Sequence, residues 1–172
     1  MKRIDMAQTR KIKREKSKKI GTGAVAVFDT PKVKGHLVAT PCHSGKGVDL
    51  IATFTKLPAG QHGFHIHKAG DLRQKNCMGL CEHYDKGKHR HGAGPASRSN
   101  RQRHTGDLGN ISHTSKKKTY CLENVSVNDL WGRSIIVHKD ADDLGKGNHE
   151  DSSITGHSGA RMACAIFGRL CH

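Results

Sequence analysis

The sequence predicts an all-β domain, an antiparallel β-sandwich or flattened barrel with two long functional loops. Short apolar runs of alternating polarity recur along the chain, and turn residues separate them. Glycine is frequent, at 20 of 172 residues, and aromatic residues make up only 4%. This composition suits many turns around short strands and argues against a helical bundle. Two spans without periodicity, 69–103 and 139–159, interrupt the pattern.

Eight segments show the apolar and β-branched character of strands. In chain order they are 24–28, 33–40, 48–54, 62–67, 108–111, 120–127, 134–138 and 163–167. The third alternates most clearly, because its apolar side chains all fall on one face of a strand: Val48, Leu50, Ala52 and Phe54. Residues 29–31, Asp-Thr-Pro, end the first segment as a turn.

The two irregular spans need a source of order. A structureless loop of such length is unusual in a compact domain unless it has a function. Metal ligation would supply ordering energy to a loop that holds the ligands. We therefore interpret both spans as functional loops.

Two histidines one residue apart, His65 and His67, lie in the fourth predicted strand. Alternate side chains of a strand point to the same face, so both imidazoles can reach one metal ion. Further candidate ligands follow along the chain: His83, His91, His104, Asp107 and His138. Neutral imidazole suits copper and zinc. Six histidines and one carboxylate are enough for two ions.

The chain is strongly basic, with a formal net charge of +15, and residues 2–19 contribute nine Lys/Arg against two acidic residues. We interpret residues 1–20 as a disordered basic arm and residues 21–172 as one domain. The arm is best explained as a solubilising tail. A nuclear-localisation patch or a nucleic-acid contact is the alternative, less favoured because no aromatic residue interleaves the charges.

The start of the chain lacks the apolar segment of a secretory signal, and no apolar stretch is long enough to span a bilayer. We expect a cytoplasmic protein, with a nuclear location as the alternative, that is not secreted and contacts no membrane. In such a compartment the prior for the six cysteines is the free thiol. Cys77 and Cys81 lack the second thiol pair of a structural zinc site.

Four motifs occur in the order and approximate spacing of one known family. They are GFHIH at 63–67, HTGDLGN at 104–110, IVHKDADDLGKG at 136–147 and GARMAC at 159–164. In these motifs the chain resembles the Cu/Zn superoxide dismutases over roughly residues 22–169. The resemblance implies a Greek-key, immunoglobulin-like sandwich. It also implies an antioxidant enzyme that converts superoxide to oxygen and hydrogen peroxide at a copper ion beside a zinc ion.

The resemblance also implies a role for each candidate ligand. Copper would be held by His65, His67, His83 and His138. Zinc would be held by His83, His91, His104 and Asp107. His83 would bridge the two ions and take up a proton when copper is reduced. His91 is favoured over His89 by its spacing of eight from His83, and His62 is read as a structural histidine.

Four further residues receive roles from the resemblance. Asp142 would join a copper histidine to a zinc histidine. Arg161 would attract the superoxide anion beside copper. Cys77 and Cys164 would form a disulfide, an exception to the reduced-thiol rule, and the cysteines without such a counterpart are read as free thiols: Cys42, Cys81, Cys121 and Cys171.

The expected partners are superoxide as substrate, a second copy of the chain in a homodimer, and a copper-delivery protein. Residues compatible with pairing are Gly70, Trp131, Gly132 and Ile166, whereas Arg169 stands where the family tends to be apolar. Two rival functions are a non-enzymatic metal carrier, like the dismutase-like domain of a copper chaperone, and a basic nucleic-acid-binding protein. The first would lack copper ligands or Arg161, and the second predicts salt-dependent binding to DNA through the arm.

Overall fold

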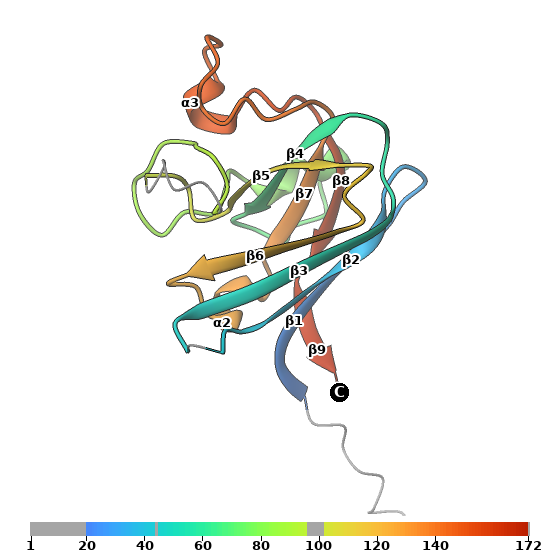
Figure 1. Ribbon diagram of the computed structural model, residues 1–172. Coiled ribbons are helices and arrows are strands. Elements are labelled where there is room, and N and C mark those ends of the chain that lie inside the picture. The colour runs from blue at the N-terminus through green and yellow to red at the C-terminus, as the bar shows by residue number, and fades with distance from the viewer. Residues whose placement is uncertain (1–19, 44, 96–101, 172) are drawn as a thin grey trace, which may run out of the picture.

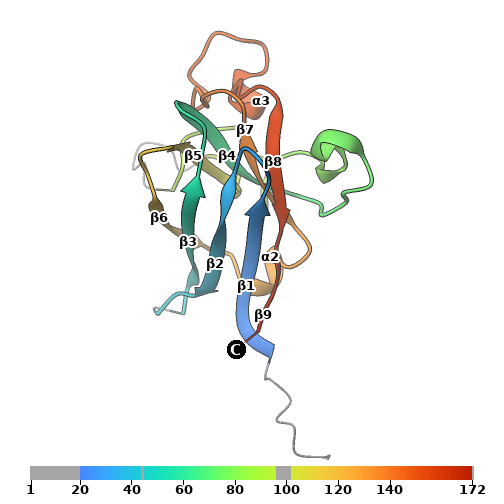
Figure 2. The ribbon, with the colours of Figure 1, turned by 90° about the vertical axis from the view of Figure 1, so that its right-hand side faces the viewer.

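The computed structural model describes residues 20–43, 45–95 and 102–171. Two antiparallel sheets pack face to face (Figures 1 and 2). One has the strand order β6-β3-β2-β1-β9, and the other has the order β5-β4-β7-β8. The predicted all-β antiparallel fold is confirmed as a two-sheet sandwich rather than a closed barrel.

The strands are β1 Ile20–Asp29, β2 Lys34–Pro41, β3 Gly47–Lys56, β4 Gln61–His67, β5 Asp107–Ser112, β6 Lys117–Glu123, β7 Ser134–His138, β8 Arg161–Ile166 and β9 Gly168–Cys171. Short helical segments in the described residues are η1 Lys75–Leu80, α2 Val127–Leu130 and α3 Ser152–Thr155. None of these has the length and hydropathy needed to cross a bilayer. The predicted basic arm lies outside the described residues, except that Ile20 begins β1.

The structure corrects the predicted strand at 120–127, because β6 ends at Glu123. A short helix, α2, follows instead. The Ser126 hydroxyl accepts a hydrogen bond from the Asp129 N–H, and the Asp129 carboxylate accepts one from the Ser126 N–H. This reciprocal pair is a capping box, which satisfies backbone donors at a helix start.

The final strand was expected to end at 167, but the chain continues as β9 in the other sheet. At the change of sheet, the Phe167 N–H donates to the Arg133 carbonyl over 2.9 Å, and its carbonyl accepts from the Gly132 N–H over 3.0 Å. The last segment of the chain thus belongs to both layers of the sandwich.

Aromatic rings join the two layers in the core. Phe54 of β3 meets Phe64 of β4 edge-on, with ring centroids 5.8 Å apart. Phe28 extends this row in one direction and Tyr120 in the other. Buried rings of this size stabilise a core by about 1.5–3 kcal/mol each, so the row holds the sheets in a defined relative position.

Strand β4 is buried on both faces. Phe64 and Ile66 belong to the core between the sheets. His65 and His67 point to the opposite face, yet they are only 0% and 2% exposed. Loop residues cover this face, because the ring centroids of His83 and His65 are 4.2 Å apart and Asp142 accepts a hydrogen bond from His65. The outer face of β4, which solvent would otherwise contact, is therefore buried at its two histidines.

A disulfide between Cys77 and Cys164 joins η1 to β8 across 87 residues of sequence. Figure 2 shows η1 in green to the side of β8. The pairing is the one that the family resemblance implied. It ties the long loop after β4 to the last strand of the four-stranded sheet.

Removal of this disulfide should destabilise the protein. The double variant Cys77→Ser/Cys164→Ser should lose about 2–5 kcal/mol of unfolding free energy, because the unfolded chain gains the freedom that the cross-link removes. Urea denaturation of metal-free protein measures this loss.

Reduction of the wild-type protein serves as the control. Dithiothreitol should lower the wild-type midpoint to that of the double variant and leave the variant unchanged. Equal midpoints for the double variant and the oxidised wild-type protein would show that the cross-link contributes nothing to stability.

Candidate metal centre

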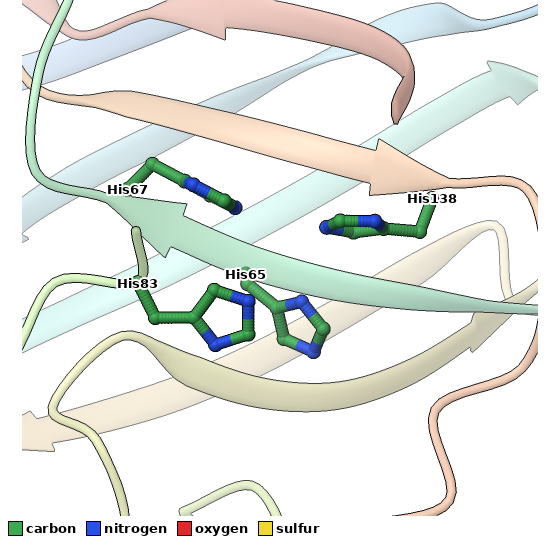
Figure 3. A group of neighbouring side chains, drawn as sticks. All are labelled: His65, His67, His83 and His138. Carbon is green, nitrogen blue, oxygen red and sulfur yellow. The ribbon is translucent and has the colours of Figure 1, made fainter. Parts of the chain in front are cut away.

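Four imidazoles converge outside β4. His65 and His67 project from β4, His138 from the end of β7 and His83 from the loop after η1 (Figure 3). Each offers a ring nitrogen, and these nitrogens all lie within 4.8 Å of one another. His83 is held in place because it pairs with His67 as an isolated antiparallel bridge.

Three of these rings are fixed through one nitrogen. His65 Nε2 donates to Asp142 Oδ2 over 2.9 Å. His67 Nδ1 donates to the Cys81 carbonyl over 2.9 Å, and His138 Nδ1 lies 3.2 Å from the Gly159 carbonyl. A carbonyl oxygen can only accept, so the proton of each such ring is on the bonded nitrogen and the other nitrogen carries a lone pair.

The remaining nitrogens have no partner among the residues that the structure describes. His65 Nδ1, His67 Nε2 and His138 Nε2 are buried and make no hydrogen bond. A buried polar atom without a partner costs about 1–3 kcal/mol. Three inward lone pairs around one point form a donor set for a metal ion, and imidazole is a ligand that copper and zinc accept.

A second cluster surrounds Asp107. Its Oδ1 atom lies 2.8 Å from His83 Nδ1, 3.0 Å from His91 Nδ1 and 3.3 Å from His104 Nδ1. Its Oδ2 atom accepts the backbone N–H groups of Gly92 and His104. Three imidazoles and one carboxylate are a donor set for tetrahedral zinc.

The two clusters share His83, so its ring lies between them. They are also joined by Asp142, whose Oδ2 contacts His65 and whose Oδ1 accepts from His91 Nε2 over 2.8 Å. Asn110 fixes the backbone of Asp142 through two hydrogen bonds of 2.7 and 2.8 Å. Sequence reasoning assigned no role to Asn110, although it is the last residue of the HTGDLGN motif.

The surroundings favour the metal-binding form of the first cluster. Burial and, to a smaller extent, the neighbouring imidazoles together lower the pKa of His65 to about 3 and that of His138 to about 4. Burial also lowers the pKa values of His67 and His83. These four rings are therefore neutral near pH 7, the form that binds a metal.

His91 behaves differently in the metal-free protein. Burial alone would lower its pKa, but hydrogen bonds to Asp107 and Asp142 outweigh burial and raise the pKa to about 9. The same contacts hold the pKa values of both carboxyl groups below their usual range despite burial. The two carboxylates thus attract positive charge, which is a proton on His91 until a cation replaces it.

Arg161 lies next to His138, its cross-strand partner between β8 and β7. Its guanidinium donates to the carbonyls of Cys77 and Cys81, each over 2.6 Å. The Cys81 carbonyl also accepts from His67. The loop tied down by the disulfide therefore fixes a cation beside the histidine cluster.

All the ligand candidates from the sequence are brought together in the two clusters, and neighbouring histidines are kept apart from them. His89 is turned outward and pairs with Asp85. His62 is buried and contacts the backbone carbonyls of Pro58, His138 and Lys139. It is a structural histidine, as its sequence context indicated.

The family of copper/zinc superoxide dismutases matches residues 33–167 of the chain. The chain belongs to this family. It is 38% identical over 146 residues to an extracellular Cu-Zn superoxide dismutase of Drosophila melanogaster, covering 81% of this chain and 78% of the relative. It is 41% identical over 144 residues to Cu-Zn superoxide dismutase 5 of Dictyostelium discoideum, covering 72% and 91%.

The fold comparison agrees. The crystal structure of the clock protein EA4 matches with a TM-score of 0.73 and 33% sequence identity, covering 88% of this chain and 96% of that chain. The protein is thus a superoxide dismutase of the copper/zinc type, with both metals as cofactors.

The expectation of a cytoplasmic protein that is not secreted is wrong. Matched relatives from Drosophila melanogaster and Haemonchus contortus are extracellular Cu-Zn superoxide dismutases, which points to secretion. The expectation rested on residue composition near position 1 and on a general prior for thiols. The Cys77–Cys164 disulfide suits an oxidising compartment.

Asp142→Asn should weaken metal binding about 10–100-fold, because an amide has only one oxygen to accept from the two imidazoles that Asp142 joins. Titration with a chelator, followed by copper and zinc analysis, measures the change. Asp140→Asn, the same substitution at an exposed site two residues away, is the matched control. Equal retention of both metals in the two variants would contradict the proposed link.

Proposed function

We propose that the two clusters divide the ligand sets of this superoxide dismutase. The copper ligands are His65, His67, His83 and His138. The zinc ligands are His83, His91, His104 and Asp107. The observation that carries this assignment is the set of three buried, unpaired imidazole nitrogens beside the shared His83.

The division follows from the chemistry of the donor atoms. When bound, copper supplies one-electron exchange with superoxide, and zinc, which has no redox chemistry, supplies a fixed positive charge. The all-imidazole set suits an ion that changes oxidation state. The set with the carboxylate carries a negative charge of its own and suits an ion that stays divalent.

His83 holds the proton that the reaction needs. Its Nδ1 atom faces Asp107 at 2.8 Å. Its Nε2 atom is then the one that belongs to the histidine cluster and carries a proton between the two half-reactions. The second superoxide would leave as hydrogen peroxide after it gains the electron given up by the first superoxide, this proton and another proton from water.

Arg161 captures the substrate. Superoxide is a small anion with little surface to recognise, so charge must attract and orient it. The guanidinium is fixed by two carbonyls and remains partly exposed. A cation held rigidly beside His138 favours the approach of an anion to that side of the cluster.

We further propose one domain over residues 21–172, which forms a homodimer and receives copper from a delivery protein. The charged Arg169, an obstacle to an apolar contact, stacks with its guanidinium carbon 4.3 Å from the Trp131 ring centroid. This contact covers part of the charge. The rival carrier function is not favoured, because Arg161 and all copper ligands of the family are present.

His138→Ala should reduce bound copper and dismutase activity to background while zinc stays at the wild-type level. The variant removes one of the three unpaired nitrogens and leaves the cluster around Asp107 untouched. Metal analysis and a superoxide-decay assay measure both effects. His36→Ala, at an exposed position of β2, is the control, and full activity in His138→Ala would refute the copper assignment.

Arg161→Glu should lower the rate about tenfold or more at low ionic strength, because a repelling charge replaces an attracting one. The difference from wild type should shrink as salt rises, since the screening length falls from about 10 Å at 0.1 M to about 3 Å at 1 M. Metal content should not change.

Lys46→Glu makes the same charge change at an exposed position in the β2–β3 turn. It should alter the rate far less than Arg161→Glu. Equal effects of the two substitutions would mean that Arg161 acts only through net charge.

A further inference from the structure

A second group of metal-binding side chains lies away from the metal centre. Cys42 directly follows β2, Asp49 is in β3 and Cys121 is in β6. One ligand atom of each lies within 4.8 Å of the others. Cys42 Sγ is 3.8 Å from Cys121 Sγ and 3.2 Å from Asp49 Oδ1.

The strand order explains this meeting. Strand β3 lies between β2 and β6 in the five-stranded sheet (Figure 1). Asp49 is directly opposite Cys121 in the register. Because Leu50 and Tyr120 are buried in the core, the alternation of the strands places Asp49 and Cys121 on the outer face of this sheet. The imidazoles lie on the outer face of the other sheet.

We propose that Cys42, Asp49 and Cys121 form a second metal site, which binds zinc through two thiolates and one carboxylate. Tetrahedral zinc with Zn–S bonds of about 2.3 Å holds two sulfur atoms about 3.8 Å apart. That is the separation of the two sulfur atoms here. The carboxylate oxygen, a hard ligand, favours zinc over copper(I), which thiolates alone would also select.

A disulfide is the less fitting use of the two cysteines. It needs Cα atoms within about 7 Å of each other. Two strands on either side of a third are separated by about twice the spacing of 4.8 Å. The thiols therefore reach toward a shared point above β3, a place for an ion, while their backbones stay apart.

In the metal-free protein the cluster keeps the Cys42 thiol protonated, with Asp49 as its hydrogen-bond acceptor. Burial and the hydrogen bond to Asp49 raise the pKa of the Cys42 thiol to about 12. The thiol proton is thus held against a carboxylate. A divalent cation reverses this balance, because a coordinating thiol is deprotonated outright.

The proposed site is open to a metal ion on one side and shielded from solvent on the other. Cys42 is buried, with 8% of its surface exposed, whereas Cys121 is exposed. A metal ion can therefore enter from the side of Cys121 and be completed by water as the fourth ligand. Structural zinc in this place would fix the β2–β3 turn against β6.

Zinc binding to the copper- and zinc-loaded enzyme tests the site. Equilibrium dialysis against Zn²⁺ with metal analysis should find one more zinc per chain than the metal centre holds. Cys121→Ser should lose this extra zinc, and Cys171→Ser, which leaves the three proposed ligands intact, should keep it. Dismutase activity should be the same in both variants, since neither Cys121 nor Cys171 is part of the metal centre.

Cobalt gives a spectroscopic readout of the ligands. Co²⁺ added to the loaded enzyme should produce a near-ultraviolet sulfur-to-cobalt charge-transfer band that Cys121→Ser abolishes. The metal centre contains no thiolate and cannot produce this band. Absence of the band and of the extra zinc, or their persistence in Cys121→Ser, would overturn the proposal.

Peroxide treatment separates the metal site from a redox pair. In a redox pair, hydrogen peroxide would oxidise one thiol to a sulfenic acid with release of water, and the second thiol would displace a second water to form the disulfide. Peptide mapping without reductant would find a Cys42–Cys121 cross-link. Its formation in an enzyme that takes up no extra zinc would likewise overturn the proposal.

Discussion

The burial of many imidazoles against two carboxylates on the outer face of one sheet is the constraint on which the rest of the structure depends. Neutral histidines can be buried cheaply only if every ring nitrogen has a partner. Within the described part of the chain, three nitrogens of the cluster formed by His65, His67, His83 and His138 have no hydrogen-bond partner. The carboxylate of Asp107 has three imidazole nitrogens around one oxygen. Two cations resolve both problems at once, so the metals complete the packing of the protein as well as its chemistry.

The long loops are ordered by the same constraint. Neither has the apolar content of a core, and both run over the outer face of the four-stranded sheet. Asp142, in the loop after β7, accepts hydrogen bonds from His65 of the sheet and from His91 of the other loop. The disulfide anchors η1, and the Cys81 carbonyl then fixes both His67 and Arg161. Arg161, the proposed substrate-capturing group, and one ring of the cluster are therefore positioned by the same short segment.

The sequence predicts those features that depend on local periodicity or on a contiguous motif. His65 and His67 share a face because strands have a period of two, and this required no knowledge of tertiary structure. Val125 and Val127 extend an apolar run and so predict a longer β6, whereas the capping box of Ser126 and Asp129 starts a helix there. Contacts between distant segments do not follow from local periodicity: Asn110 meets Asp142 across 32 residues and Cys42 meets Cys121 across 79. The prediction of cellular location was wrong for a different reason, because residue composition does not determine whether a protein is secreted.

The alternation along β4 has a consequence for how the chain reaches its native state. Phe64 faces the core and His65 faces the loops, and each is aligned with a particular residue of β7. A register slip of one position would exchange the core-facing and loop-facing side chains of β4. The imidazoles would then enter the hydrophobic core, and apolar side chains would replace the metal-ligating nitrogens. Such a misaligned chain could hold neither ion. Metal binding therefore adds to the free energy that separates the native register from the slipped one.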